Sequence, residues 1–392
     1  MTEHVLTINA GSSSVKFALY ALDDRPVERL RGQVDGIGAT PRIEARVGTE
    51  ILADGDPLDP ATDQAAALQQ ILRLIERRFG GVAIPAVGHR VVHGGVDYAA
   101  PMVLDAKVLA DLERLVRLAP LHQPHNLAGI RAARAAFPQA LQVACFDTAF
   151  HRAHPWVNDT FALPRSYYDE GVRRYGFHGI SYEYVAMRLR AVAPARAAGR
   201  VAIAHLGNGA SMCAVRDGRS VGSTMGFTAL DGLPMGTRCG QLDPGVVLYM
   251  LDEKGMDARE IEAVLYKQSG LKGLSGLSHD MRELEAAGTP EAEEAIAYFV
   301  FRIRRELGAM AAILGGLDAL VFCGGIGEHA WRVRERVCAD MGWLGIALDR
   351  GRNRAGETVV SADESAVAVL VIRTDEEQMI AAHTAALLAA SR

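Results

Sequence analysis

The sequence predicts an α/β protein built from two similar domains, and three observations support this prediction. Strand-like and helix-like segments alternate along the 392 residues, which is typical of α/β architecture. A strand–turn–strand pattern in the first half recurs in the second half. Several apolar strand-like runs lead directly into glycine-rich or polar segments, which is where α/β folds bind their ligands. We therefore expect two domains that flank a central cleft.

Two segments give the clearest helical predictions. Segment 61–79 places apolar residues from Leu68 to Phe79 at helical spacing. Segment 289–314 has Thr289 as a capping residue, a proline at the first turn, and Gly315 at its end. Its apolar stripe is expected to lie in the core. The stripe consists of Ile296, Phe299, Val300, Ile303, Leu307, Met310 and Leu314.

Four apolar runs are predicted to be buried strands because each is short, apolar and followed by a polar or glycine-rich segment. These runs are residues 141–146, 201–206, 319–323 and 367–372. The alanine-rich segment 191–199 is predicted to be a surface connection that precedes the second half.

An internal repeat is the strongest sign of a duplicated domain. Residues 5–19 align with residues 201–215 without a gap, at an offset of 196 residues (201 − 5). Gly11 then falls on Gly207, Asn9 falls on His205, and apolar residues match on both sides. The repeat predicts a similar hairpin in each half, with the two turns facing a shared cleft. A chance similarity between two glycine turns is the alternative.

The composition is that of an ordinary globular protein, with 49% hydrophobic residues and a net charge of −5. The slight acidity and the lack of a basic block argue against nucleic-acid binding. No run approaches the roughly 20 apolar residues that span a bilayer, and the N-terminus has no secretory pattern. The five cysteines lack metal-ligand spacing and are expected to be reduced. Together these features predict a cytoplasmic protein that binds neither membrane nor nucleic acid.

Three segments combine glycines with side chains suited to anionic ligands. Segment 9–16 offers hydroxyls, an amide, a lysine and backbone N–H groups, which suit phosphate oxygens although the segment is not a Walker loop. Arg90 lies among glycines in segment 88–95, and Arg238 lies in segment 236–244. A guanidinium group matches a carboxylate or phosphate through two hydrogen bonds. A plain hairpin turn is the alternative for segment 9–16, and a structural ion pair is the alternative for Arg90.

Other candidates follow predicted strands or lie in glycine-rich loops. Asp147 comes directly after the run 141–146, and His178 lies between glycines in segment 175–179. The glycine-rich turn at 324–329 is a weak nucleotide signal on its own.

The segment before the last predicted helix is also rich in carboxylates. Thr374 and Glu377 fit a capping box. This pattern leaves Asp375 and Glu376 to face a cleft, and Glu376 is the candidate magnesium ligand.

Taken in order, these motifs resemble the acetate kinase family, within the actin, hexokinase and sugar kinase superfamily. The resemblance runs nearly end to end, through residues 9–17, 88–95, 146–151, 175–179, 205–209, 235–238, 280–282 and 325–328. It implies duplicated actin-like ATPase (ribonuclease H-like) domains. Residues 1–149 with 374–392 would form the N-terminal domain, and residues 150–373 the C-terminal, nucleotide-binding domain. It also implies a homodimer formed through the second domain.

The resemblance implies reversible transfer of the ATP γ-phosphoryl group to acetate, which gives acetyl phosphate and ADP. Mg²⁺, with Mn²⁺ as an alternative, would be the metal. A propionate or butyrate kinase, a sugar kinase and a non-catalytic actin-like nucleotide-binding protein are the alternatives. The family usually assigns Asp147 the acid/base role. Because a carboxylic acid is already ionised at neutral pH, we expect Asp147 to orient Arg90 or a metal-bound water instead.

The resemblance also assigns roles to other residues. Arg90 and Arg238 would clamp the acyl carboxylate and the transferred phosphoryl group, and His178 would hydrogen-bond the phosphoryl oxygens. Val92 and Leu121 would lie near the acyl methyl group.

The same resemblance predicts metal and nucleotide ligands. Asn9 and Glu376 would hold the magnesium, and Ser14 and Lys16 would lie near phosphate oxygens. The nucleotide would be lined by His205, Leu206, Gly207, Asn208, Gly209, Asp280, Met281, Arg282, Gly325, Ile326, Gly327, Glu328 and His329.

The sequence departs from the family pattern at several positions. Ala229 replaces a common proline, and Pro234 replaces a common apolar residue. These two leave acyl-chain selectivity open, because one methylene group is worth only about 1–3 kcal/mol of discrimination. Tyr182 stands where the family commonly has histidine. The remaining departures are Gln123, His125, Ile180 and His329.

Overall fold

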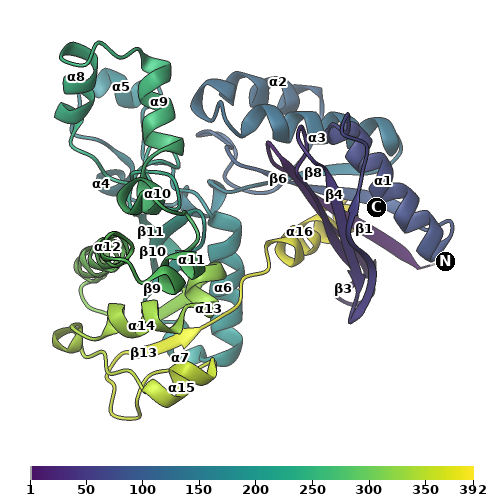
Figure 1. Cartoon of the computed structure of the whole chain (residues 1–392). Coiled ribbons are helices and arrows are strands. Elements are labelled where there is room, and N and C mark those ends of the chain that lie inside the picture. Colours follow the sequence, from purple (N-terminus) through teal and green to yellow (C-terminus); the bar gives the residue numbers. More distant parts are fainter. Residues whose placement is uncertain (1) are drawn as a thin grey trace. The chain divides into compact units, whose positions relative to one another are not determined.

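The computed structural model describes residues 2–392, which form two compact units (Figure 1). Unit 1 contains the chain up to Phe150 together with Asp375–Arg392, and unit 2 contains His151–Thr374. Each boundary differs by one residue from the division drawn from the sequence. None of the five cysteines, all of which lie in the described range, forms a disulfide. Among the described residues, no helix combines the length and the apolar character that crossing a bilayer requires.

Unit 1 is built on an eight-stranded sheet with the order β5-β4-β3-β2-β1-β6-β8-β7. Neighbours from β5 to β1 are antiparallel, while β6 runs parallel to β1 and β8 runs parallel to β6. The strands are β1 (Glu3–Ala10), β2 (Ser14–Leu22), β3 (Pro26–Asp35), β4 (Arg42–Val47), β5 (Glu50–Pro57), β6 (Ala83–Val91), β7 (Met102–Val103) and β8 (Leu141–Phe146).

Helices cover both faces of this sheet. On one face, α1 (Gln64–Phe79) and α3 (Gln123–Ala136) enclose an apolar core with β1 and β2. On the other face, α16 (Glu376–Ala390) packs against β1 and β6. A Cβ at Gly88 would lie 2.6 Å from Ile380 and 2.3 Å from Thr384, so glycine lets α16 approach the sheet. The other helices are α2 (Ala106–Arg114) and η1 (Leu115–Leu118), and η2 (Ala149–His151) spans the boundary with unit 2.

Unit 2 has a five-stranded sheet with the order β11-β10-β9-β12-β13. Helix α12 packs against β9, β10 and β11, and α6 packs against β9 (Figure 1). The strands are β9 (Arg200–Leu206), β10 (Ala210–Arg216), β11 (Arg219–Ser223), β12 (Ala319–Cys323) and β13 (Ala368–Val371). The helices are α4 (Trp156–Asp159), α5 (Arg165–Asp169), α6 (Gly179–Val192), α7 (Pro194–Ala197), α8 (Pro244–Asp252), α9 (Ala258–Lys267), α10 (Gly270–Ser275), α11 (Met281–Ala287), α12 (Pro290–Leu314), α13 (Gly324–His329), α14 (Trp331–Cys338), η3 (Gly342–Leu344) and α15 (Arg350–Ala355).

The two sheets share one five-strand core, which confirms the predicted duplication. Strands β3-β2-β1-β6-β8 of unit 1 correspond in order and direction to β11-β10-β9-β12-β13 of unit 2. The hairpin turns differ, because the register leaves residues 11–14 between the strands in unit 1 and residues 207–209 in unit 2. The ungapped alignment is therefore right for the first strands and one residue out for the second. A cleft between the two halves stays a prediction.

Most of the local predictions for strands and helices are confirmed, but the predicted connection at 191–199 was wrong. Thr289 caps α12 through the Ala292 N–H, Gly315 ends it in a left-handed conformation, and the predicted stripe is buried. The four predicted strands are β8, β9, β12 and β13. Segment 191–199 is not a plain connection, because α6 extends to Val192 and α7 fills 194–197. Alanine and arginine are strong helix formers, which accounts for this difference.

Candidate active site

In unit 1, polar side chains gather on the α16 face of the sheet, at the carboxyl ends of β1 and β6. Gly88 faces α16, and side chains alternate along a strand, so Arg90 lies on the same face. Thr7 pairs with Gly88 across β1 and β6, which places Asn9 on this face too. Lys16 pairs with Asn9 across the β1–β2 hairpin, so it lies on the same face as Asn9 and Arg90. The sheet therefore brings together predicted residues that are 81 positions apart (90 − 9).

Two carboxylates flank Arg90. Its Nε and Nη2 donate to the two carboxylate oxygens of Asp147, at 3.0 and 2.7 Å. A carboxylate oxygen of Glu376 lies 3.6 Å from Nε. The Asp147 side chain is 2% exposed and that of Arg90 is 21% exposed. Asp147 is thus in position to orient the guanidinium group, as expected from the chemistry of a carboxylate acceptor, while the roles of both residues in a reaction stay predictions.

Burial and charge act in opposite directions on these groups. Burial lowers the pKa of Arg90, but Asp147 and Glu376 outweigh this effect and raise the pKa above its ordinary value. Burial raises the pKa of Asp147 above its ordinary value, and the charge of Arg90 opposes that rise. Because both oxygens of Asp147 accept N–H bonds, this carboxyl group is ionised in the pair. Arg90 is therefore a permanent, oriented cation.

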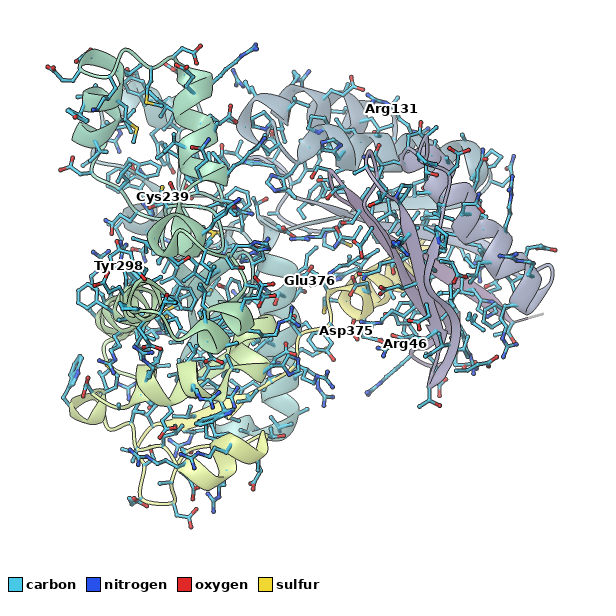
Figure 2. The ribbon with its side chains drawn as sticks, in the orientation of Figure 1. Arg46, Arg131, Cys239, Tyr298, Asp375 and Glu376 are labelled. Carbon is cyan, nitrogen blue, oxygen red and sulfur yellow. The ribbon has the colours of Figure 1, made fainter. Side chains whose placement is uncertain are left out.

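The start of α16 differs from the sequence prediction. Asp375, not Thr374, caps the helix, because its Oδ1 accepts the Gln378 N–H at 3.0 Å. Both oxygens of Asp375 also accept from Arg31 of β3, at 2.8 and 2.7 Å. The Thr374 hydroxyl is hydrogen-bonded within unit 2 instead. The predicted capping box was wrong, and Asp375 is tied to β3, whereas Glu376 begins the helix beside it (Figure 2).

The oxygen donors at this edge of the sheet fit a magnesium ion. Asn9 offers an amide oxygen and Glu376 a carboxylate. Within residues 2–392, no group of three or more His, Cys, Asp or Glu residues is arranged to hold a metal. Mg²⁺ does not need such a group, because it keeps several waters and binds through one or two protein oxygens plus substrate phosphates.

The helix α3 fixes the segment that carries Val92. Asn126 accepts the Val92 N–H at 3.0 Å and donates to the last residue of β1 at 2.7 Å. Gln123 accepts the His93 N–H at 3.3 Å and donates to the His93 carbonyl at 3.1 Å. Leu121 is half-buried just before this helix. Sequence reasoning missed Asn126 and noted Gln123 only as a departure; buried amide side chains at a helix start were the available signal.

In unit 2, two imidazole rings stack at the carboxyl end of β9. The ring centroids of His178 and His205 are 4.3 Å apart, with 21° between the planes. His178 comes just before α6 with a φ of 57°. Its Nδ1 lies 2.8 Å from Oγ of Ser211, and Nδ1 of His205 lies 2.8 Å from Oγ of Ser181. Hydroxyl groups therefore set the orientation of both rings.

Gly209 is the point at which the predicted phosphoryl ligands of unit 2 meet. A Cβ at this glycine would lie 3.2 Å from Nε2 of His178 and 3.9 Å from Nη1 of Arg238. A glycine here leaves space beside a histidine and an arginine for an anionic group.

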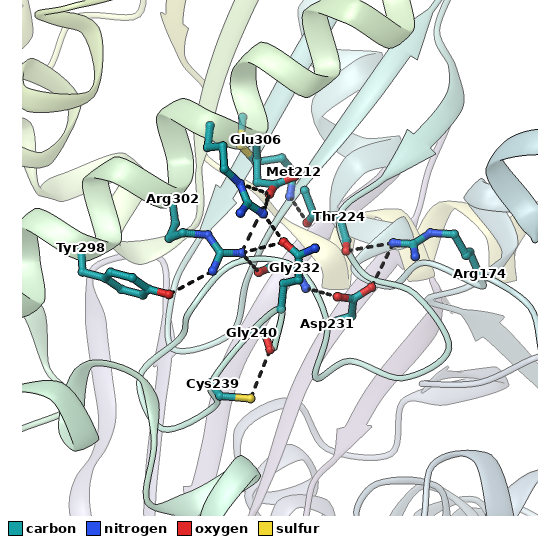
Figure 3. Close-up of polar contacts among 12 residues, drawn as sticks. Arg174, Met212, Thr224, Asp231, Gly232, Cys239, Gly240, Tyr298, Arg302 and Glu306 are labelled. Carbon is teal, nitrogen blue, oxygen red and sulfur yellow. Dashed lines mark hydrogen bonds and ion pairs between the residues drawn. The ribbon is translucent and has the colours of Figure 1, made fainter. Parts of the chain in front are cut away.

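Arg238 lies in a long segment, residues 224–243, without helix or strand. Its Nη1 donates to the Ala229 carbonyl at 2.9 Å. The buried Arg302 of α12 donates to the Gly232 carbonyl at 3.2 Å and to Tyr298 at 3.0 Å (Figure 3). Arg302 thus fixes the segment that carries Arg238 to the core helix of unit 2. Sequence reasoning missed this arginine, which is the one charged residue that interrupts the apolar stripe of α12.

The glycine-rich segments after β9 and β12 lie side by side. A Cβ at Gly207 would lie 3.9 Å from the Gly325 nitrogen. Gly324 has a φ of 74°, and a Cβ there would lie 2.7 Å from the Leu206 carbonyl oxygen. The carboxylate of Glu328 accepts two backbone N–H groups, those of Gly324 and Thr374, both at 3.0 Å. Glu328 therefore holds the loop, whereas Gly325 is exposed.

The third predicted nucleotide segment begins α11. Asp280 caps this helix through the Arg282 N–H at 2.8 Å, and the two side chains form an ion pair. The Arg282 side chain is 89% exposed and can reach a ligand. Met281 and Leu206 are buried in the core, so a ligand could contact them only through the backbone.

Glycine-rich loops at strand ends, combined with oriented arginines and imidazoles, define a protein that binds phosphate-bearing ligands. Comparison with known proteins narrows this class. The model of the acetokinase family matches residues 4–382, and the chain belongs to that family. The resemblance predicted from the motifs is confirmed.

Named relatives match along nearly their whole length. A protein named acetate kinase from Methylocella silvestris is 59% identical over 99% of this chain and 98% of its own. One from Nitrobacter hamburgensis is 53% identical over 98% of this chain and 96% of its own.

Solved structures confirm the fold class. A Porphyromonas gingivalis acetate kinase matches with a TM-score of 0.89 and 37% identity, covering 98% of this chain and 100% of that chain. A propionate kinase from Francisella tularensis matches with a TM-score of 0.92 and 35% identity, covering 97% of this chain and 99% of that chain.

Proposed function

We propose that this protein is an acetate kinase, which transfers the γ-phosphoryl group of ATP to acetate and gives acetyl phosphate and ADP. Membership of the acetokinase family and the names of relatives at 59% and 53% identity support the proposal. The structural observation that carries it is the Arg90–Asp147 pair, which presents an oriented cation at the ligand-binding edge of a sheet.

The chemistry of the acceptor explains why an oriented cation is needed. A carboxylate oxygen attacks the γ-phosphorus, and the bond from that phosphorus to the β–γ bridging oxygen breaks, so the electron pair leaves with ADP. No proton is transferred, because the acid is already ionised. The barrier lies in bringing two anions together, so positioning and fixed positive charge dominate catalysis.

In unit 1, Arg90 would hold the acyl carboxylate. A guanidinium group has five N–H donors, and the pair with Asp147 uses two of them. Val92 and Leu121 would contact the methyl end of the acid. Asp147 then acts by orienting Arg90 and not as a base.

The remaining groups of unit 1 would bind phosphate and metal. Ser14 and Lys16 would contact phosphate oxygens, and Asn9 and Glu376 would hold Mg²⁺, or Mn²⁺ in its place. The metal would neutralise charge on the phosphates when bound.

In unit 2, Arg238 and His178 would stabilise the phosphoryl group in flight, which their convergence on Gly209 supports. Segments 205–209 and 325–329, with Asp280–Arg282, would bind the nucleotide. The exposed Gly325 and the exposed Arg282 support this assignment.

An acyl-phosphate assay tests the proposal. The full chain is incubated with ATP, Mg²⁺ and acids of two, three or four carbons, and acyl phosphate is trapped with hydroxylamine. We expect the highest kcat/KM with acetate, and no product when the acid is omitted or replaced by a sugar. ATP consumption without hydroxamate from any acid would contradict the proposal.

A propionate kinase is the second candidate. Ala229, which replaces a common proline, supplies the carbonyl that binds Arg238 at 2.9 Å, and a propionate kinase is among the similar solved structures. A higher kcat/KM with propionate in the same assay would favour this candidate.

We further propose a homodimer formed through unit 2. None of the residues of α8 is buried, and its Leu248, Tyr249 and Leu251 are 58%, 50% and 40% exposed. An apolar helix face of this kind is typical of an interaction surface. Light scattering should give twice the chain mass of 42.1 kDa and a lower mass for Leu248→Glu. A monomeric wild-type protein would contradict the proposal.

A further inference from the structure

A buried tyrosine and a buried serine form a hydrogen-bond chain behind His178. Tyr182 lies on α6, one helical turn after His178, and Ser211 lies on β10; both are 0% exposed. The Tyr182 hydroxyl bonds to Oγ of Ser211. The same Oγ lies 2.8 Å from Nδ1 of His178. The chain leads from the core of unit 2 to the ring that lies beside Gly209.

The direction of each hydrogen bond follows from proton counting. Within residues 2–392, the Tyr182 hydroxyl has Ser211 as its hydrogen-bond partner and no other. A buried hydroxyl proton without an acceptor costs about 1–3 kcal/mol, so Tyr182 donates to Ser211. Burial raises the pKa of Tyr182 well above its ordinary value, so this phenol keeps its proton and always donates.

The position of the Ser211 hydroxyl proton then determines which ring nitrogen of His178 carries a proton. Its oxygen already accepts from Tyr182, and its own proton needs a buried acceptor. The neighbouring Nδ1 of His178 at 2.8 Å is that acceptor. A neutral imidazole carries one proton, which must then lie on Nε2.

We propose that Tyr182 and Ser211 are positioning residues that fix neutral His178 as the tautomer protonated on Nε2. Nε2 would lie 3.2 Å from a Cβ at Gly209, so it is the ring nitrogen that faces the convergence point. There it donates to an anionic oxygen without giving up its proton. The importance of this tautomer for turnover rests on the proposed function, whereas the tautomer itself does not.

The resemblance to the family predicts a histidine, and not a tyrosine, at position 182. A histidine in this position could donate or accept, according to its own tautomer. A protonated tyrosine with one partner only donates. The stacked His205, 4.3 Å away, restricts rotation of the His178 ring, so the tautomer and the ring plane are set by separate contacts.

Nitrogen-15 NMR of the full chain tests the proposal directly. Histidine is labelled on both ring nitrogens, and the His178 signals among the 12 histidines are assigned by their loss in His178→Gln. At neutral pH and without substrates, we expect a protonated Nε2 and an unprotonated Nδ1. Tyr182→Phe should give a mixture of the two tautomers, and Tyr184→Phe on the same helix should leave the signals unchanged.

Kinetics provide the second measurement. For Tyr182→Phe we expect kcat to fall about 10-fold or more with little change in KM, by analogy with the partners that fix the tautomer of metal-ligating histidines, which typically contribute 10–100-fold. A proton on Nδ1 of His178, or a single Nε2 tautomer retained in folded Tyr182→Phe, would overturn the proposal. If Tyr182→Phe does not fold, the wild-type tautomer and the Ser211→Ala variant decide. Failure of the proposed function would instead appear as the expected tautomer in a protein that forms no acyl phosphate.

Discussion

The two units place different polar groups on the same five-strand core. At the strand ends of unit 1, the positive charge of Arg90 is flanked by the carboxylates of Asp147 and Glu376. At the strand ends of unit 2, the stacked rings of His178 and His205 are held by neutral hydroxyl groups. The comparison shows that the duplicated scaffold fixes where polar groups gather, while a few side chains at the strand ends decide whether these groups are charged or neutral.

The hairpin turns repeat this contrast. The turn at 11–14 of unit 1 presents serine hydroxyls and closes with a Gly11 N–H bond to the Ser14 carbonyl at 2.7 Å. The turn at 207–209 of unit 2 is Gly-Asn-Gly and closes with a Gly207 N–H bond to the Gly209 carbonyl at 3.0 Å. The first turn offers side chains to a ligand, and the second lets a ligand approach the backbone.

The largest expected effect comes from removing the charged group of unit 1, the guanidinium of Arg90. We expect Arg90→Ala, like Arg238→Ala, to lower kcat by about 10³-fold, which is the size of effect seen when an arginine that stabilises phosphoryl transfer is lost. Acetyl phosphate formation at saturating ATP and acetate measures it. Arg78→Ala is the control, because Arg78 forms an exposed ion pair with Glu50 in the same unit. Near-normal turnover in Arg90→Ala would remove the proposed clamp.

A smaller effect separates backbone strain from ligand contact in unit 2. Gly324→Ala should lower the free energy of unfolding by more than the roughly 1–2 kcal/mol that a left-handed conformation costs an L-residue, because φ is 74° and the added Cβ would also lie 2.7 Å from the Leu206 carbonyl oxygen. Gly325→Ala meets open space, so it should leave stability unchanged while raising the KM for ATP. Urea unfolding and initial-rate kinetics measure the two variants. Equal KM values for Gly325→Ala and wild type would exclude this loop from nucleotide contact.

A pH-dependent effect compares the buried histidines of the two units. Burial lowers the pKa of His89 in unit 1 and of His151 in unit 2 to about 4 each. Between pH 6.5 and 4 the unfolded chain binds protons that the folded chain excludes. Stability should therefore fall as pH falls through this window, by about 1.4 kcal/mol per pH unit for each histidine.

Urea unfolding at pH 7.5, 6.0 and 5.0 measures this dependence. His89→Asn should reduce the change in unfolding free energy per pH unit by the contribution of one histidine, because the buried ring bonded to Gln142 is removed. Stability that stays constant from pH 7.5 to 5.0 would show that the folded protein accommodates the protonated rings.

The sequence predicted the elements whose patterns are local, and not the contacts that depend on distant partners. Helix α12 has its cap, its stripe and its terminal glycine within one segment. The cap of α16 was wrong because Asp375 is selected by Arg31, which is 344 residues away. The one-residue difference between the two turns depends on strand register, which an ungapped comparison does not contain.

The residues of the candidate site also fall into those that the sequence predicted and those that it missed. Motif resemblance pointed to Arg238 and His178, because they lie in glycine-rich segments that can be recognised along the chain. The residues that hold them, Ser211 and Arg302, were missed because they lie within ordinary strand and helix patterns. Their importance follows from what they contact, and neighbours in space are not visible in a single sequence.

The return of α16 to unit 1 has a consequence for the order in which the molecule is completed on the ribosome. Unit 2 ends at Thr374, so all of its parts have been synthesised before α16 emerges. Until then, the face of the first sheet that bears Val5, Ala18 and Ala86 lacks its covering helix. The half that is translated first is thus finished last, and a chain that stops short of α16 has an uncovered sheet and no Glu376.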